Sequence, residues 1–257
     1  MSTINHYLQI AFQERTSRIY HAVQDILAVI IVLSVILIAT ESVEGLYERY
    51  TNLFHISELA IVAIFTVEYL IYVYLAKDKA AYILSFFGLI DLMAILPTYL
   101  ALFFASFLPL HSLLVLRVVR VLRLLRVVRV LKLIPYTAQR QGVARVVPWR
   151  ALEIAFFAMF SVVVISGTLV FLAEGGVPRT KFTDIPQGMW WALVTLTTVG
   201  YGDLVPQTFL GRIVAALTMF TGFILFVVFV AIFSRRLQKM LLGNLAEEED
   251  EDETSLY

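Results

Sequence analysis

The sequence contains no cysteine and has few charged residues, so disulfide bonds and thiolate metal sites are excluded. Charged residues make up 16% of the chain, whereas soluble domains average about 25%. Hydrophobic residues make up 60%, and the mean hydropathy is +0.84. These values exclude an ordinary soluble domain and indicate a membrane protein.

Signatures of catalysis and of cofactor binding are also missing from the sequence. There is no nucleophile with a matching base, no P-loop and no cluster of metal ligands, and the 4 histidines are scattered. An internal repeat, which many secondary transporters contain, is not visible either. We therefore expect a protein that is not an enzyme, that holds no cofactor and that has no nucleic-acid partner.

Long apolar runs make up most of the chain. A run of about 20 apolar residues can cross the hydrocarbon core of a bilayer as a helix. Residues 185–197 are too few to cross and predict a re-entrant helix, and Pro97 should divide its span into two half-helices. The sequence thus predicts an all-α membrane protein with six transmembrane helices, at residues 22–40, 53–76, 83–108, 113–134, 149–173 and 209–233.

Basic residues outside the spans lie mainly on one side of the predicted membrane. They occur in the N-terminal segment, in the loop 77–79, in the linker before Pro148 and after residue 233. The positive-inside rule therefore predicts a multi-pass protein of the plasma membrane with both termini in the cytoplasm. We expect the acidic run 247–253 to be solvated and disordered.

The fourth predicted span carries a basic residue at every third position. Charges inside a bilayer cost about 2.5–3.5 kcal/mol each on insertion scales, so this pattern needs a use or a compensation. In a 3₁₀-helix, residues three apart line one face. A membrane field acts on each charge with about 2.3 kcal/mol per 100 mV, which favours a voltage sensor; a basic amphipathic helix lying on anionic lipid is the alternative. The six residues are Arg117, Arg120, Arg123, Arg126, Arg129 and Lys132.

Acidic residues in the neighbouring spans can compensate these charges. Glu58 and Glu68 lie in the second span, and Asp91 lies in the third. We expect them to pair in turn with the sliding arginines, while static packing pairs are the alternative. Phe65 precedes Glu68 by about one helical turn, so both side chains point the same way and the ring can separate outer from inner water.

A second informative stretch reads T-T-V-G-Y-G-D, at residues 197–203. Because glycine tolerates backbone conformations closed to other residues, alternating glycines can aim successive carbonyl oxygens to one side. Four such loops around an axis would stack rings of oxygens that replace the water shell of a cation. A tight turn between two helices is the alternative. The predicted ion site consists of Thr198, Val199, Gly200, Tyr201 and Gly202.

These motifs, with I-F-T-V-E-Y-L at 64–70 and I-D-L-M-A-I-L-P at 90–97, resemble the voltage-gated potassium channels of Kv type. The resemblance implies a homotetramer. Each subunit would have a four-helix voltage-sensor domain and a two-helix pore domain with a re-entrant pore helix and a selectivity filter. The domains would be a cytoplasmic N-terminal segment at 1–21, the sensor at 22–134, a linker at 135–148, the pore at 149–233, and a cytoplasmic stem with an acidic tail at 234–257.

The resemblance also implies a role for each of the residues beside the basic ladder. Phe65, Glu68 and Asp91 would form a charge-transfer centre, and Glu58 would be an outer countercharge.

In the pore domain, the resemblance implies that Trp190 and Trp191 brace Tyr201, that Asp203 supports the filter, and that Gly222 is the gating hinge. Interfacial anchoring is the alternative for the tryptophans, and close helix packing is the alternative for the glycine. The Pro-Val-Pro bend of many animal members is missing from residues 226–233, so the position of the inner gate stays open.

The sequence therefore predicts a passive, K⁺-selective channel that opens on depolarisation, when residues 117–129 move outward past Phe65. Its expected partners are K⁺ ions, membrane lipids and further copies of the chain, with K⁺ as the permeant ion and not a cofactor. Two alternatives stay open. One is a hyperpolarisation-opened or weakly selective cation channel of the same architecture, and the other is a secondary transporter whose carboxylates relay protons.

Overall fold

The computed structural model describes residues 3–14, 17–107, 125–132, 148–178 and 180–254 of the chain, and every regular element within these ranges is a helix. This confirms the all-α fold class for the described residues. The elements are α1 (Thr3–Phe12), α2 (Arg18–Glu41), α3 (Leu46–Leu75), α4 (Lys79–Ile83), α5 (Phe86–Phe107), the 3₁₀-helix η1 (Leu125–Lys132), α8 (Pro148–Glu174), α9 (Ile185–Leu196) and α10 (Phe209–Thr254).

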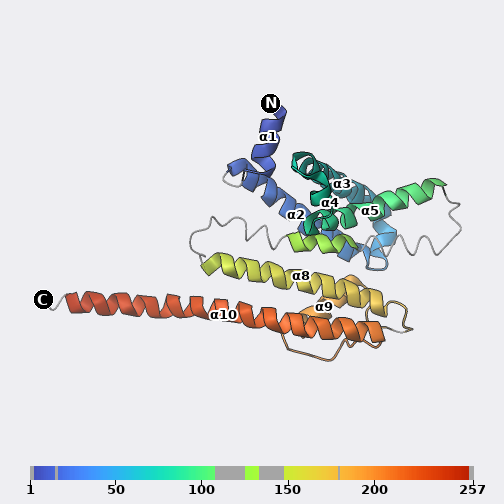
Figure 1. The fold of residues 1–257 in the computed structure, drawn as a ribbon. Helices are drawn as coiled ribbons and strands as arrows, with labels where there is room; N and C mark the ends of the chain where they lie inside the picture. The colour runs from blue at the N-terminus through green and yellow to red at the C-terminus, as the bar shows by residue number, and fades with distance from the viewer. Residues whose placement is uncertain (1–2, 15–16, 108–124, 133–147, 179, 255–257) are drawn as a thin grey trace.

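The helices form two adjoining groups (Figure 1). Helices α2 to α5 lie together, η1 lies between them and α8, and α10 runs alongside α8 with α9 packed on both. Helix α1 packs on α2 and α3. The N-terminal half of the chain thus forms one bundle, and the last three helices form a second.

Four of the described helices are long and apolar enough to cross a membrane: Arg18–Glu41, Leu46–Leu75, Ile154–Glu174 and Phe209–Arg235. Helix α5 contributes a shorter apolar stretch, Phe86–Leu100. Of the predicted fourth span, only residues 125–132 lie in the part of the chain that the structure describes. The helices establish a membrane protein, and the layout of six spans stays a prediction.

The expected division of the third span at Pro97 is wrong. Helix α5 continues through Pro97, which removes only one backbone donor, and a break appears instead at residues 84–85. There Ser85 begins α5, because its Oγ accepts a hydrogen bond from the backbone N–H of Gly88 at 3.1 Å. A serine that satisfies an N–H of the first turn favours a helix start at this position, and membrane helices tolerate an interior proline because neighbouring groups satisfy the freed backbone.

The disorder expected for the acidic run 247–253 is also not found. Helix α10 is 46 residues long and includes this run up to Thr254. At 1.5 Å per residue it extends about 69 Å, more than twice the hydrocarbon thickness of a bilayer. Leucine, alanine, lysine and glutamate, which dominate residues 237–249, are good helix formers, and the helix continues through Gly243 and Asn244.

The two bundles of one chain are joined by a shared core and by two polar contacts. Val130 of η1 and Val164 of α8 belong to the same buried cluster as Val62 and Phe65. Ser161 Oγ of α8 donates to the carbonyl of Val130 at 3.3 Å. At the other end, the backbone N–H of Ile185, which begins α9, donates to Ser42 Oγ after α2, at 2.9 Å. The N-terminal bundle therefore packs against the last three helices of its own chain.

Candidate functional site

The loop 197–203 leaves the C-terminal end of α9 in an alternating backbone conformation. Helix α9 begins at an N-cap, where Asp184 Oδ1 accepts from the backbone N–H of Gln187 at 2.8 Å, and it ends at Leu196. The φ angles of Thr198, Gly200 and Gly202 are 61°, 60° and 76°. Alternation of left-handed and right-handed residues turns every second peptide over, so successive carbonyl groups face the same side. Glycine adopts this conformation at no steric cost, whereas Thr198 is strained.

Trp190 and Asp203 brace this loop from outside. Trp190 Nε1 donates to Asp203 Oδ2 at 2.9 Å, and its ring stacks on Tyr201 with 6.0 Å between centroids and a 10° interplanar angle. Lys181 Nζ donates to the carbonyl of Asp203 at 2.9 Å. The hydrogen bond from Trp190 holds the pKa of Asp203 below its usual value. The loop is therefore clamped at Tyr201 and at an ionised Asp203.

The second tryptophan of the predicted pair lies elsewhere. Trp191 is buried and packs edge-on against Phe182, with ring centroids 6.0 Å apart. It belongs to the buried cluster that joins α8, α9 and α10. Trp190 therefore contacts Tyr201, whereas Trp191 anchors α9 in the protein core.

Glu174, which was not among the predicted site residues, is fully buried at the C-terminal end of α8. Its Oε1 accepts three hydrogen bonds, from the backbone N–H groups of Gln207 (3.0 Å) and Thr208 (2.9 Å) and from the Thr208 hydroxyl (2.8 Å). These donors immediately precede α10, where a carboxylate is favoured by the helix dipole. Glu174 thus joins the end of α8 to the start of α10, just beyond the filter loop. The sequence signal that could have indicated this role is an isolated acidic residue at the end of an apolar run.

Gly222 lies where α10 crosses the end of α9. A Cβ at this position would come within 3.1 Å of Leu196 Cα, which is closer than ordinary van der Waals contact. Helix α10 is continuous here. The structure therefore gives Gly222 a close packing contact, and its role as a hinge stays a prediction.

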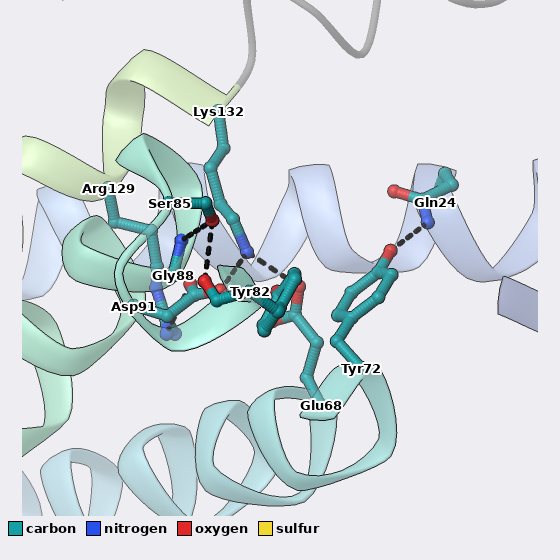
Figure 2. A network of polar contacts seen from close by, with 9 residues as sticks. All are labelled: Gln24, Glu68, Tyr72, Tyr82, Ser85, Gly88, Asp91, Arg129 and Lys132. Carbon is teal, nitrogen blue, oxygen red and sulfur yellow. Dashed lines mark hydrogen bonds and ion pairs between the residues drawn. The ribbon is translucent and has the colours of Figure 1, made fainter. Parts of the chain in front are cut away.

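Two basic side chains of η1 lie in a buried acidic site between α3 and α5 (Figure 2). Arg129 Nη2 donates to Asp91 Oδ1 at 2.9 Å. Lys132 Nζ donates to Asp91 Oδ2 at 2.6 Å and to Glu68 Oε1 at 3.0 Å. The guanidinium carbon of Arg129 lies 3.5 Å from the centroid of the Phe65 ring. The structure thus brings together three predicted residues of the charge-transfer centre and the last two of the ladder.

The site is almost closed to solvent. Arg129 and Asp91 are 1% and 0% exposed, and Lys132 is 13% exposed. Arg129 Nε and Nη1 and Glu68 Oε2 have no hydrogen-bond partner among the described residues. Burial of two charges costs about as much as their attraction returns, whereas removal of one partner costs about 3–5 kcal/mol. Replacement of one basic residue by the next in this site therefore costs much less free energy than leaving Glu68 and Asp91 without a cation.

The remaining sensor residues are placed only in part. Glu58 is buried on α3, about two turns before Phe65, and its Oε1 accepts from Thr98 Oγ1 at 3.1 Å. Arg126 belongs to η1, but its side chain is not among those described. Arg117, Arg120 and Arg123 lie outside the described residues, so their pairing stays a prediction.

The sequence is similar to those of known ion-transport proteins. The family model described as ion transport protein matches residues 22–242. The chain is 33% identical over 243 residues to a Rhodopseudomonas palustris protein that is provisionally named as a potassium channel protein. The alignment covers 89% of this chain and 56% of that protein.

Two animal proteins are also similar. The potassium voltage-gated channel protein Shal of Drosophila melanogaster is 35% identical over 184 residues, which is 68% of this chain and 30% of Shal. The A-type voltage-gated potassium channel KCND3 of Homo sapiens is 35% identical over 181 residues, which is 68% of this chain and 26% of KCND3. The chain thus spans about half or less of the length of these relatives.

Proposed function

The chain belongs to the ion transport protein family, and we propose that it is a subunit of a voltage-gated, potassium-selective channel. The observation that carries the proposal is the burial of Arg129 and Lys132 against Glu68 and Asp91. The same chain contains the loop 197–203, with its alternating backbone. The basic residues of η1 respond to an electric field, and the loop 197–203 binds a dehydrated cation. Together they fit a pore that the membrane potential opens.

The pore is formed by four copies of the chain. Val199 and Tyr201 are 54% and 68% exposed in one chain, although filter residues need neighbours on every side. Large apolar side chains of α10, such as Phe220 at 75% exposed, are also uncovered. Four loops around an axis supply the carbonyl rings of residues 198–202, which bind K⁺ in place of its water shell. Transport is passive, without enzymatic chemistry.

The sensor consists of the first four of six transmembrane spans. The membrane is the plasma membrane, and both termini lie in the cytoplasm. In this layout the basic residues before Arg129 lie on its outer side. Lys132, the last of the ladder, is held by Glu68 and Asp91. This position corresponds to a sensor near the outward end of its travel, as expected for depolarised conditions.

The electrical work is large enough to drive opening. Movement of three or four charges in each of four subunits gives about 28–37 kcal/mol per 100 mV. On depolarisation, residues 117–129 move outward past Phe65 and draw the linker with them, which releases the inner ends of α10.

Reconstitution of the purified protein tests the proposal directly. We expect K⁺ flux into liposomes that exceeds Na⁺ flux by orders of magnitude, and single-channel steps in planar bilayers. Equal Na⁺ flux, or slow saturable flux coupled to protons, would contradict a selective channel. Opening at negative rather than positive voltages would retain the pore and reverse the proposed polarity.

A further inference from the structure

A second aromatic ring lies beside the charge site, one helical turn beyond Glu68 on α3. Lys132 Nζ is 5.6 Å from the centroid of the Tyr72 ring, within the range of about 6 Å at which an ammonium is attracted to an aromatic face. Figure 2 shows Lys132 reaching into the site between Asp91 and Glu68, with Tyr72 beside them. Phe65 faces Arg129 and Tyr72 faces Lys132, so each of the two basic residues is close to its own ring.

The Tyr72 ring is fixed from three sides. Gln24 Nε2 of α2 donates to its hydroxyl at 2.8 Å. Tyr82 of α4 stacks on it, with ring centroids 6.0 Å apart and an interplanar angle of 21°. Phe12 of α1 meets it edge-on, at 5.4 Å and 89°. A ring with this many partners is held in one orientation before any charge arrives, so little ordering remains to be done when Lys132 enters.

Helix α1 is itself attached to the same end of α3. The Tyr74 hydroxyl donates to Asn5 Oδ1 at 2.9 Å, and Gln13 Nε2, just after α1, donates to the carbonyl of Leu75 at 3.0 Å. These bonds keep Phe12 against Tyr72. The N-terminal helix, which lies outside the predicted sensor domain, therefore supports one wall of the charge site.

The basic ladder ends at Lys132. Leu133, Ile134 and Pro135 follow Lys132 and carry no charge. A further outward step would replace Lys132 by an apolar side chain and leave Glu68 and Asp91 buried without a cation, which is strongly unfavourable. The site that holds Lys132 is therefore the outward stop of the ladder.

We propose that Tyr72 is a positioning residue of the sensor: held by Gln24, Tyr82 and Phe12, it retains Lys132 at the outward stop. This inference rests on the proposed function, because it requires that the ladder moves with voltage. It adds a residue on α3 and a supporting helix, α1, to the machinery that sets how long the sensor stays outward.

Substitution of the ring tests the proposal in planar bilayers with the full-length protein. For Tyr72→Leu we expect the equilibrium between outward and inward sensor to fall by about two- to fivefold per subunit, as for loss of a cation–π contact. The voltage of half-activation then moves to more depolarised values, and channels close faster on return to negative voltage. Tyr72→Phe keeps the ring and loses only the Gln24 bond, so its shift should have the same direction as that of Tyr72→Leu and be clearly smaller.

Two further variants make the test specific. In a Lys132→Gln background, Tyr72→Leu should cause no additional shift, because the cation it contacts is absent. Phe12→Ala leaves the site itself intact and should shift half-activation in the same direction as Tyr72→Leu, which keeps the proposal testable if Tyr72→Leu fails to assemble.

The possible outcomes distinguish the proposed channel function from the role of Tyr72. Wild-type channels without voltage dependence would overturn the proposed function. Voltage-dependent wild-type channels whose half-activation and closing rate are unchanged by Tyr72→Leu, or moved the opposite way, would overturn only the role of Tyr72. A shift that persists in the Lys132→Gln background would overturn it as well.

Discussion

The guanidinium carbon of Arg129 lies 3.5 Å from the centroid of the Phe65 ring, while its Nη2 donates to Asp91. The ring covers a charge that water cannot reach, and Nε and Nη1 find no hydrogen-bond partner among the described residues. Only one face and one edge of the guanidinium are therefore stabilised. Partial stabilisation of this kind is compatible with the proposed movement of the basic residues past Phe65.

Asp91→Asn should remove the main acceptor of both Arg129 and Lys132. Because both cations are buried, we expect the described sensor position to lose about 3–5 kcal/mol. The channel should then need stronger depolarisation to open, and the protein should unfold at lower temperature. Glu44→Gln, a change at an exposed acid, is the matched control and should leave both measurements unchanged.

Neutralisation of Arg123 and Arg126 should make opening less steep with voltage. Each charge contributes about 2.3 kcal/mol per 100 mV in proportion to the fraction of the field that it crosses. The limiting slope of open probability against voltage gives the charge moved, and we expect it to fall by about half if three or four charges move per subunit. Arg140→Gln, in the linker, should keep the wild-type slope. An unchanged slope in Arg123→Gln/Arg126→Gln would remove the sensor argument.

Trp190→Phe should raise the pKa of Asp203, because it deletes the hydrogen bond that lowers it. A carboxylate whose folded-state pKa is lowered stabilises the fold above its unfolded pKa, and this contribution is lost as the pH falls through the folded value. The variant should therefore lose K⁺ current at a higher external pH than the wild type. Trp191→Phe leaves the Asp203 bond intact, so its acid midpoint should match the wild type.

Glu174→Ala should destabilise the junction of α8 and α10. It leaves the N–H groups of Gln207 and Thr208 without their acceptor. Because these donors are only part-buried, we expect a cost toward the lower end of the about 1–3 kcal/mol for an unsatisfied buried group. Glu174→Gln keeps one acceptor oxygen and should be milder. Thermal unfolding of the detergent-solubilised protein, followed by circular dichroism, measures both, and equal melting temperatures for the two variants would contradict this role.

Patterns within one element allowed the sequence to predict a large part of the candidate site. The triplet spacing marked Arg129 and Lys132, and the rarity of acids in apolar spans marked Glu68 and Asp91. The structure brings these four residues together with Phe65.

What the sequence did not reveal depends on contacts between elements. Tyr72 acquires its position from Phe12, Gln24 and Tyr82, which come from three other helices. The role of Glu174 depends on its hydrogen bonds to the start of α10, which is 34 residues away in the sequence. The break expected at Pro97 was wrong because an interior proline removes only one backbone donor, and α5 continues through it.

The 3₁₀ conformation of η1 sets the geometry of each three-residue step from Arg126 to Arg129 and Lys132. In an α-helix, a step of three residues turns the next side chain by about 300°, so the helix would have to screw about its axis. In a 3₁₀-helix the same step is a straight translation of about 6 Å. In the proposed sensor, these basic residues can therefore advance by translation without rotation of the helix, in equal increments of one basic residue each.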